Sequence, residues 1–158
     1  MRIECTFESP IGRLRIAAND MAITDVDYDD DNQDLPTITP RSLLLQQACQ
    51  QLTEYFAGQR QQFELPLAPA GTDFQQAVWH ALQAIPYGEH RSYKDISLAI
   101  NNPNAMRAVG AANGRNPITI IIPCHRVIGA SGKLVGYTGG MDRKVWLLNH
   151  EAKVSQSQ

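Results

Sequence analysis

The chain has 158 residues, of which 43% are hydrophobic and 19% charged, and its formal net charge is −2. This is the composition of an ordinary soluble globular protein, and the length allows one domain or two small ones. No apolar run approaches the roughly 20 residues that a membrane-spanning helix needs. The N-terminus lacks the apolar region of a signal peptide, so we expect a cytoplasmic protein that does not associate with a membrane.

The three cysteines, Cys5, Cys49 and Cys124, lie far apart in the sequence. An odd number of cysteines without an export signal argues against a disulfide framework. No C-x-x-C or H-x-x-x-H spacing occurs, so we predict no metal site. We expect Cys5, in a predicted strand, and Cys49, on the apolar face of a predicted helix, to act as small buried apolar residues.

Charge is distributed unevenly along the chain. Residues 1–89 contain 5 Lys/Arg and 13 Asp/Glu, a net charge of −8, whereas residues 90–158 contain 9 and 3, a net charge of +6. A basic half beside an acidic half is expected when one half contacts a polyanion such as nucleic acid. The alternative is a chance distribution of solvated charges, which charge counting alone does not exclude.

The first part of the chain predicts a small αβ domain. Short strands are expected at residues 3–7, 14–16 and 22–28. A helix is predicted to begin with Thr39 as N-cap and Pro40 at its first position, and to end at Gly58. After a weaker strand at residues 63–67, the sequence Ala-Pro-Ala-Gly indicates a linker, so we place a domain boundary near residue 70.

The second part predicts mostly helices. Thr72 and Gln75 form a capping box for the first helix, and Ser92 is expected to cap the second. A third helix is predicted to begin with Asn102 as N-cap and Pro103 at its first position.

The second and third of these helices have the proportions of a helix-turn-helix, although a plain helical hairpin that packs a core has the same spacing. Arg107, near the start of the third helix, and Arg115, just past its end, favour DNA binding.

A β-branched run at residues 118–122 predicts a buried strand that leads into Pro123-Cys124-His125-Arg126-Val127. A thiol reacts as its thiolate, and its ordinary pKa of about 8.5 means that a reactive cysteine needs a base or a positive neighbour. Adjacent side chains in an extended chain point to opposite sides, so Cys124 and His125 need a turn or a bridging water to act together. By itself the Cys-His pair is only weak evidence for a nucleophilic cysteine.

The segment around Cys124, preceded by Asn116-Pro117, resembles the active-site signature of the O6-alkylguanine-DNA alkyltransferases, also called methylated-DNA–protein-cysteine methyltransferases. The resemblance spans residues 72–152 and includes other motifs in the same order: Ser92-Tyr93, Arg107-Ala108-Val109-Gly110, Tyr137-Thr138-Gly139-Gly140, and Trp146-Leu147-Leu148 ahead of Glu151. It implies an α+β protein with a small N-terminal αβ domain, residues 1–70, built from a short antiparallel sheet and a helix. A mostly helical domain, residues 71–158, would follow, with a winged-helix-like helix-turn-helix that binds DNA and carries the alkyl acceptor.

The resemblance also implies catalytic roles. Cys124 would accept the alkyl group, and His125 would act as its base through a bridging water, oriented by Glu151. Asn116 would hold the recognition helix and the active-site strand together. Tyr93 would assist departure of the repaired base and help to rotate the backbone phosphate.

Further residues would bind the substrate. Arg107 would enter the base stack where the extruded nucleotide has left. The backbone carbonyls of Cys124 and Val127 would bind the exocyclic amine of guanine. Tyr137, Thr138 and Gly139 would form the pocket wall, with Thr138 near the alkylated oxygen, whereas we expect structural roles for Arg126, Trp146 and Leu148.

The function implied is DNA repair by irreversible, single-use transfer of the alkyl group from O6-alkylguanine, and from O4-alkylthymine, to Cys124. We expect a monomer that approaches double-stranded DNA from its minor-groove side and needs neither cofactor nor metal. One alternative is an alkyltransferase-like protein, which binds lesions but lacks the cysteine, and the presence of Cys124 argues against it. Two further alternatives are a helix-turn-helix transcription factor, which would not react with an alkylated base, and a Cys-His hydrolase, which would catalyse repeated turnovers.

Overall fold

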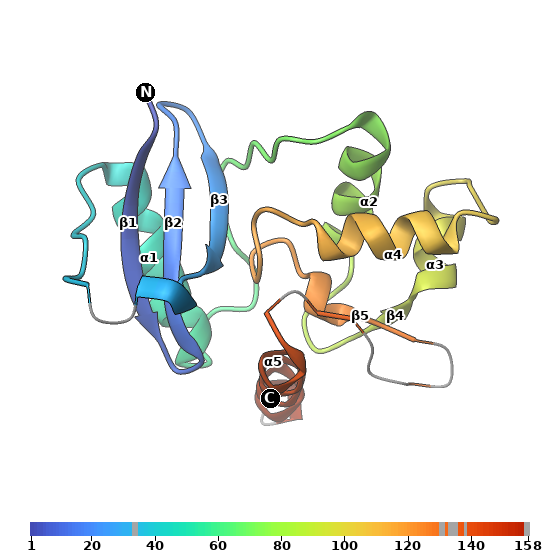
Figure 1. The fold of residues 1–158 in the computed structure, drawn as a ribbon. Helices are drawn as coiled ribbons and strands as arrows, with labels where there is room; N and C mark the ends of the chain where they lie inside the picture. The colour runs from blue at the N-terminus through green and yellow to red at the C-terminus, as the bar shows by residue number, and fades with distance from the viewer. Residues whose placement is uncertain (33–34, 130–131, 133–135, 138, 157–158) are drawn as a thin grey trace. The chain divides into compact units, whose positions relative to one another are not determined.

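The computed structural model describes residues 1–32, 35–129, 132, 136–137 and 139–156. The chain divides into two compact units, Met1–Pro69 and Ala70–Gln158, and each is described by itself (Figure 1). Strands and helices are both present, which confirms the α+β class. Within the described ranges, no helix combines the length and the apolar character needed to cross a membrane.

The first unit is built on a three-stranded antiparallel sheet in the order β1-β2-β3. The strands are β1 (Ile3–Ser9), β2 (Gly12–Ala18) and β3 (Ile23–Tyr28), which confirms the three predicted strands. Cys5 lies opposite Ile16, and Ile16 lies opposite Val26. All three are fully buried, so this row of side chains forms one side of the core.

The helix α1 (Leu43–Phe56) packs against the sheet, and its buried side chains Leu45, Ala48, Leu52 and Tyr55 complete the core (Figure 1). The predicted start at Thr39 and Pro40 is wrong. Ser42 is the N-cap, because its hydroxyl accepts a hydrogen bond from the Leu45 amide at 3.0 Å. The short 3-10 helix η1 (Asp30–Asn32) follows β3.

The strand predicted at residues 63–67 is reduced to an isolated parallel bridge between Leu67 and Ile23. The Ile23 amide donates to the Pro66 carbonyl, and the Ala68 amide donates to the Ile23 carbonyl, both at 2.8 Å. A proline within the segment removes a backbone donor, which explains why the pairing does not extend.

The second unit begins with α2 (Asp73–Gln83) and α3 (Tyr93–Ala99), and both predicted caps are confirmed. The third helix, α4 (Met106–Gly114), begins later than predicted: Ala105 is its N-cap, and the Ala105 amide donates to the Asn102 carbonyl in a separate turn. Helices α3 and α4 pack together, as do α2 and α4. The indole Nε1 of Trp79 donates to the Ala112 carbonyl at 2.8 Å, which fixes α2 against the end of α4.

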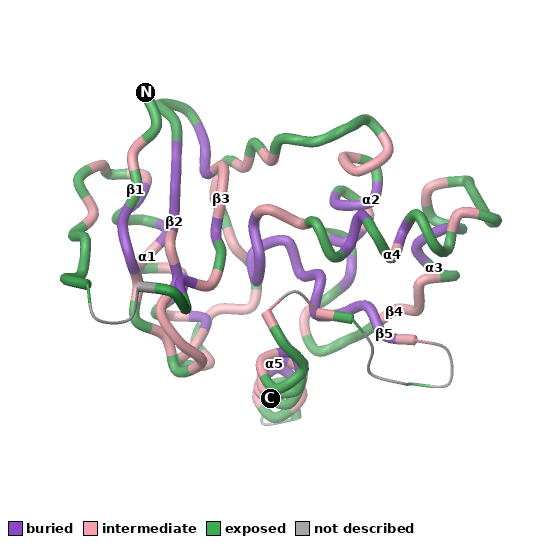
Figure 2. Tube along the Cα trace, viewed as in Figure 1, coloured by how far each residue is buried: buried purple, intermediate pink, exposed green. Residues whose placement is uncertain are grey.

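The strand predicted at residues 118–122 is not formed, although the predicted burial of this segment is confirmed. Residues 118–128 are all buried, but residues 119–122 form turns (Figure 2). The Ile121 amide donates to the Thr119 carbonyl at 2.8 Å, and Ile120 between them has φ of +72°. This is a γ-turn of the rare strained kind, and an isoleucine with positive φ is an outlier that occurs where surrounding contacts hold it.

A short parallel pair, β4 (Arg91–Ser92) and β5 (Val127–Ile128), joins the start of α3 to the chain after Cys124. The last helix, α5 (Met141–Gln156), buries Lys144, Leu147 and Glu151 along one face. Spacings of three and four residues place these side chains on a single stripe, so two charged groups lie on the inward side of the helix.

Candidate active site

Cys124 opens a short 3-10 turn, η2 (Cys124–Arg126), that follows Pro123. The Cys124 amide donates to the Ile122 carbonyl at 2.8 Å, and the Arg126 amide donates to the Pro123 carbonyl at 3.0 Å. The chain is therefore not extended here. The expectation that Cys124 and His125 point to opposite sides, which holds for an extended chain, does not apply to this turn.

The Cys124 side chain is shielded from solvent, with 5% of the residue exposed. Burial raises the pKa of this thiol, while hydrogen bonds from Asn116 and Thr119 and the charge of Lys144 act in the opposite direction without cancelling it. At neutral pH the resting side chain is therefore a thiol, and its reaction as a nucleophile needs a base to take the proton.

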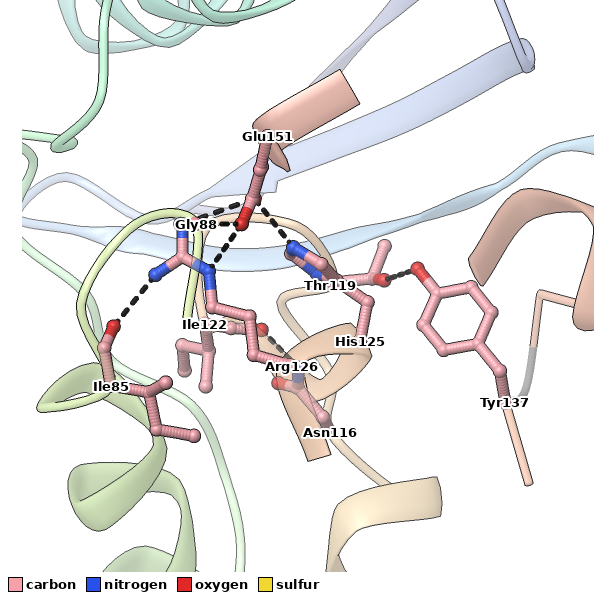
Figure 3. A network of polar contacts seen from close by, with 9 residues as sticks. All are labelled: Ile85, Gly88, Asn116, Thr119, Ile122, His125, Arg126, Tyr137 and Glu151. Carbon is pink, nitrogen blue, oxygen red and sulfur yellow. Dashed lines mark hydrogen bonds and ion pairs between the residues drawn. The ribbon is translucent and has the colours of Figure 1, made fainter. Parts of the chain in front are cut away.

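His125 is fully buried and bonded to Glu151, with 2.7 Å between Nε2 and Oε2 (Figure 3). Burial lowers the pKa of the imidazole, and the Glu151 charge only partly opposes this, so the ring is neutral at neutral pH. A carboxylate accepts hydrogen bonds, which places the ring proton on Nε2 and leaves the lone pair on Nδ1. Nδ1 is buried and makes no hydrogen bond to any residue that the structure describes.

Glu151 is 1% exposed and accepts hydrogen bonds from two further residues (Figure 3). Arg126 donates from Nε to Oε1 at 2.8 Å and from its terminal nitrogen to Oε2 at 3.1 Å, and the Gly88 amide donates to Oε1 at 3.3 Å. Despite burial, the neighbouring His125 and Arg126 hold the pKa of this carboxyl far below its usual range. Arg126 also donates to the Ile85 carbonyl at 2.8 Å, so it links α5 to the end of α2.

Asn116 closes the loop between α4 and the active-site turn. Its side-chain nitrogen donates to the Ile122 carbonyl at 2.8 Å (Figure 3). Its side-chain oxygen accepts from the Ile118 amide at 3.0 Å. One amide group thus joins both ends of the strained segment that contains Ile120.

Two buried side chains hold backbone carbonyls at the site. Asn113, in the last turn of α4, donates to the Cys124 carbonyl at 3.3 Å. Lys144, fully buried on α5, donates to the Val127 carbonyl at 2.5 Å. These are the two carbonyls to which the sequence resemblance assigns binding of the exocyclic amine.

The remaining predicted site residues lie on three segments. Tyr93 is the first residue of α3, and burial, with a smaller contribution from the ionised form of Cys124, raises the pKa of its phenol. Arg107 is exposed on the first turn of α4. The hydroxyl of Tyr137 forms a hydrogen bond with the Thr119 hydroxyl at 2.8 Å. The Gly139 carbonyl accepts a hydrogen bond from Arg143 at 3.2 Å. Thr138 lies outside the described residues.

Three residues close to Cys124 were not singled out in the sequence: Asn113, Thr119 and Lys144. A signal existed for Lys144, because it falls on the same helical stripe as Leu147 and Glu151, where an apolar residue is usual. No pattern in the sequence marks Asn113 or Thr119, since their roles depend on the turn geometry of residues 116–124.

Comparison with known proteins identifies both units. Residues 73–153 match the family model described as "6-O-methylguanine DNA methyltransferase, DNA binding domain". Residues 3–69 match the model described as "6-O-methylguanine DNA methyltransferase, ribonuclease-like domain".

Curated relatives agree over almost the whole chain. The methylated-DNA–protein-cysteine methyltransferase of Methanosarcina barkeri is 49% identical over 147 residues, which cover 91% of this chain and 93% of the relative. The constitutive methylated-DNA–protein-cysteine methyltransferase of Bacillus subtilis is 48% identical over 160 residues, with 96% of each chain covered.

Solved structures share the fold. The O6-methylguanine methyltransferase of Mycobacterium tuberculosis superposes with a TM-score of 0.84 at 48% identity, over 97% of this chain and 94% of the other. The same organism's OGT in complex with DNA gives a TM-score of 0.85 at 50% identity, over 94% and 92% of the two chains. With both halves matched by family models and with such relatives, this chain belongs to the 6-O-methylguanine DNA methyltransferase family.

Proposed function

We propose that this protein repairs DNA by transferring the alkyl group of O6-alkylguanine to the sulfur of its own Cys124. The observation that carries the proposal is the buried hydrogen bond between Glu151 and His125, the residue that directly follows Cys124. It leaves Nδ1 of His125 without a hydrogen bond to any residue that the structure describes. A base with this arrangement suits a thiol whose pKa is raised by burial.

The proposed reaction moves one proton and one alkyl group. The Cys124 proton passes through a bridging water to Nδ1 of His125, and Glu151 stabilises the imidazolium that forms. The thiolate attacks the alkyl carbon, so that a sulfur–carbon bond forms as the carbon–O6 bond breaks. The electron pair of that bond stays with the base, which takes up the proton of the Tyr93 phenol and leaves as guanine. The phenol then regains a proton from solvent and His125 releases the one it took from Cys124, so that the net transfer is one proton from the thiol to the base.

The product explains why the protein acts once. A thioether carbon is not activated towards water, so the acceptor is not regenerated. The same displacement would act on O4-alkylthymine, in which the alkyl group is also carried by an exocyclic oxygen of the base.

We propose that the second unit, residues 70–158, binds DNA through α3 and α4. The alkylated oxygen is not accessible inside a duplex, so the nucleotide must leave the stack at a cost of a few kcal/mol. The exposed Arg107 on α4 suits the role of the side chain that fills the gap, entered from the minor-groove side. The carbonyls of Cys124 and Val127, held by Asn113 and Lys144, would accept the amine of the extruded guanine. We expect the protein to act as a monomer.

The test is loss of O6-methylguanine from a synthetic duplex, followed by chromatography of the digested DNA. The wild-type protein should remove no more lesions than there are protein molecules, whereas Cys124→Ala should remove none and still bind the duplex. Repeated turnover would instead indicate a hydrolase, and binding without repair by the wild type would indicate a lesion-binding protein or a transcription factor.

Arg107→Ala separates extrusion from chemistry. It should slow repair of the duplex by about tenfold or more, because the gap in the stack is no longer filled, and should leave the reaction with free O6-benzylguanine unchanged. Equal slowing of both reactions would place Arg107 in the chemistry and contradict the role proposed for it.

A further inference from the structure

A second pair of sulfur atoms lies in the first unit. The sulfur of Cys5, on β1, is 3.7 Å from the sulfur of Cys49, on α1. The two residues are 44 positions apart in the sequence, and both are free thiols. They meet because α1 packs against the strand that carries Cys5 (Figure 1).

We propose that Cys5 and Cys49 form a peroxide-reactive pair, in which a hydroperoxide oxidises Cys49 and Cys5 then closes a disulfide between β1 and α1. The observations that carry it are the facing sulfurs and their unequal exposure: Cys5 is fully buried, whereas Cys49 is partly exposed. An oxidant from solvent therefore reaches Cys49 first, and the buried neighbour is already in place to react with the product.

The chemistry balances in two steps. The Cys49 thiolate attacks the outer oxygen of a hydroperoxide, so that a sulfur–oxygen bond forms, the oxygen–oxygen bond breaks, and water or an alcohol leaves. The Cys5 sulfur then attacks the sulfenic acid, a sulfur–sulfur bond forms, and the hydroxyl group departs with the Cys5 proton as water. Two thiols lose two electrons in total, and the peroxide gains them.

The pairing also divides the roles of the two thiols. The hydrogen bond between them lowers the pKa of the Cys49 thiol and raises that of Cys5, to which burial also contributes. Cys49 is thus the thiol that ionises first, in agreement with its exposure. To bond, the sulfurs must approach from 3.7 Å to about 2.05 Å.

The pair differs from Cys124 in its response to an oxidant. Cys124 is buried, and its thiol pKa is raised without a second thiol beside it. A hydroperoxide should therefore oxidise Cys49 faster than Cys124 by at least about tenfold. The modified protein should keep its acceptor thiol, whatever reaction that thiol performs.

Mass spectrometry of the full chain tests the proposal. After treatment with one equivalent of hydrogen peroxide and alkylation in denaturant, the protein should have lost the mass of two hydrogen atoms, and alkylation should label one cysteine rather than three. A non-reducing digest should contain the Cys5 peptide joined to the Cys49 peptide, and dithiothreitol should reverse this. The variant Cys124→Ser, which keeps only the pair, should form the same disulfide and then take up no alkyl label.

Two single variants assign the order of events. Cys5→Ser should leave a Cys49 sulfenic acid that dimedone traps, whereas Cys49→Ser should leave Cys5 unmodified, with circular dichroism as the check that each variant is folded. Oxidation of Cys124 before Cys49, a disulfide only between two chains, or a stable sulfenic acid in the wild type would each overturn the proposal.

Discussion

At the scale of single residues, Glu151 is the group on which the arrangement around Cys124 depends. Its carboxylate accepts from the His125 ring, from the Arg126 guanidinium and from the Gly88 amide, in a position shielded from water. A buried charge with good partners adds little net stability, but removal of one partner leaves the others uncompensated. The same carboxylate fixes which nitrogen of His125 is basic, so stability and chemistry depend on one side chain.

Glu151→Gln therefore tests this residue. The change keeps the shape but removes the charge that compensates Arg126, and should lower the free energy of unfolding by about 3 kcal/mol. The rate of alkyl transfer should fall by a larger factor than the affinity for DNA. Urea unfolding and single-turnover kinetics give the two readouts. Glu89→Gln, which breaks the exposed pair with Arg91, is the matched control and should change stability by less than about 1 kcal/mol; an equal effect of the two substitutions would contradict the account.

Acid should destabilise the protein through the same pair. The pKa of His125 lies below its ordinary 6.5, so the unfolded chain binds the proton first, and this contribution to stability is lost as the pH falls from 6.5 towards the lowered value. The pKa of Glu151 lies below its ordinary 4.5, so its contribution is present above pH 4.5 and is lost as the pH falls further. Urea unfolding at a series of pH values should show both losses. His125→Asn should lack the first, and an unchanged profile in that variant would show that another group is responsible.

At the scale of elements, the sequence was informative where local pattern decides the structure. The strands of the first unit and the capped starts of α2 and α3 follow from residue spacing and cap chemistry. Residues 118–122 look like a strand because they are β-branched and apolar, and they are buried as expected. They form turns because the side chain of Asn116, which lies just outside the β-branched run, bonds to both of its ends, a constraint that the spacing of the run does not reveal. The pattern around Cys124 marked the site by resemblance, but not the partners Asn113 and Lys144.

The turn between α2 and β4 is a further element on which the site depends. Gly88 has φ of +80°, donates to Glu151, and a Cβ at this position would lie 2.2 Å from the Ser155 hydroxyl and 3.1 Å from the Ser155 Cβ. Gly88→Ala should cost about 1–2 kcal/mol in backbone strain and shift α5 relative to this turn. Gly132→Ala is the matched control, because Gly132 has φ of +77° but nothing within 4 Å of its Cβ position. The melting temperature and the repair rate should fall more in Gly88→Ala than in Gly132→Ala. Equal decreases would mean that backbone strain alone, and not the contacts of Gly88, explains the effect.

At the scale of the whole molecule, the basic C-terminal half and the acidic N-terminal half suit a protein that presents one part of its chain to a polyanion. Binding through phosphate contacts releases counterions, and each contact adds a slope of about −0.9 to log K against log salt concentration. Repair of a duplex at low protein concentration should therefore fall steeply with salt. Reaction with free O6-benzylguanine, which has no phosphate, should stay nearly constant, and equal salt dependence of the two would argue against binding through the basic half.

We propose that Cys124 accepts one alkyl group and keeps it. Intact-mass measurement after incubation with an excess of duplex containing O6-methylguanine tests this most directly. We expect the protein to gain one methyl group per chain and no more, and the group to map to the peptide that contains Cys124. An unchanged mass while lesions disappear, or a methyl group on another residue, would contradict it.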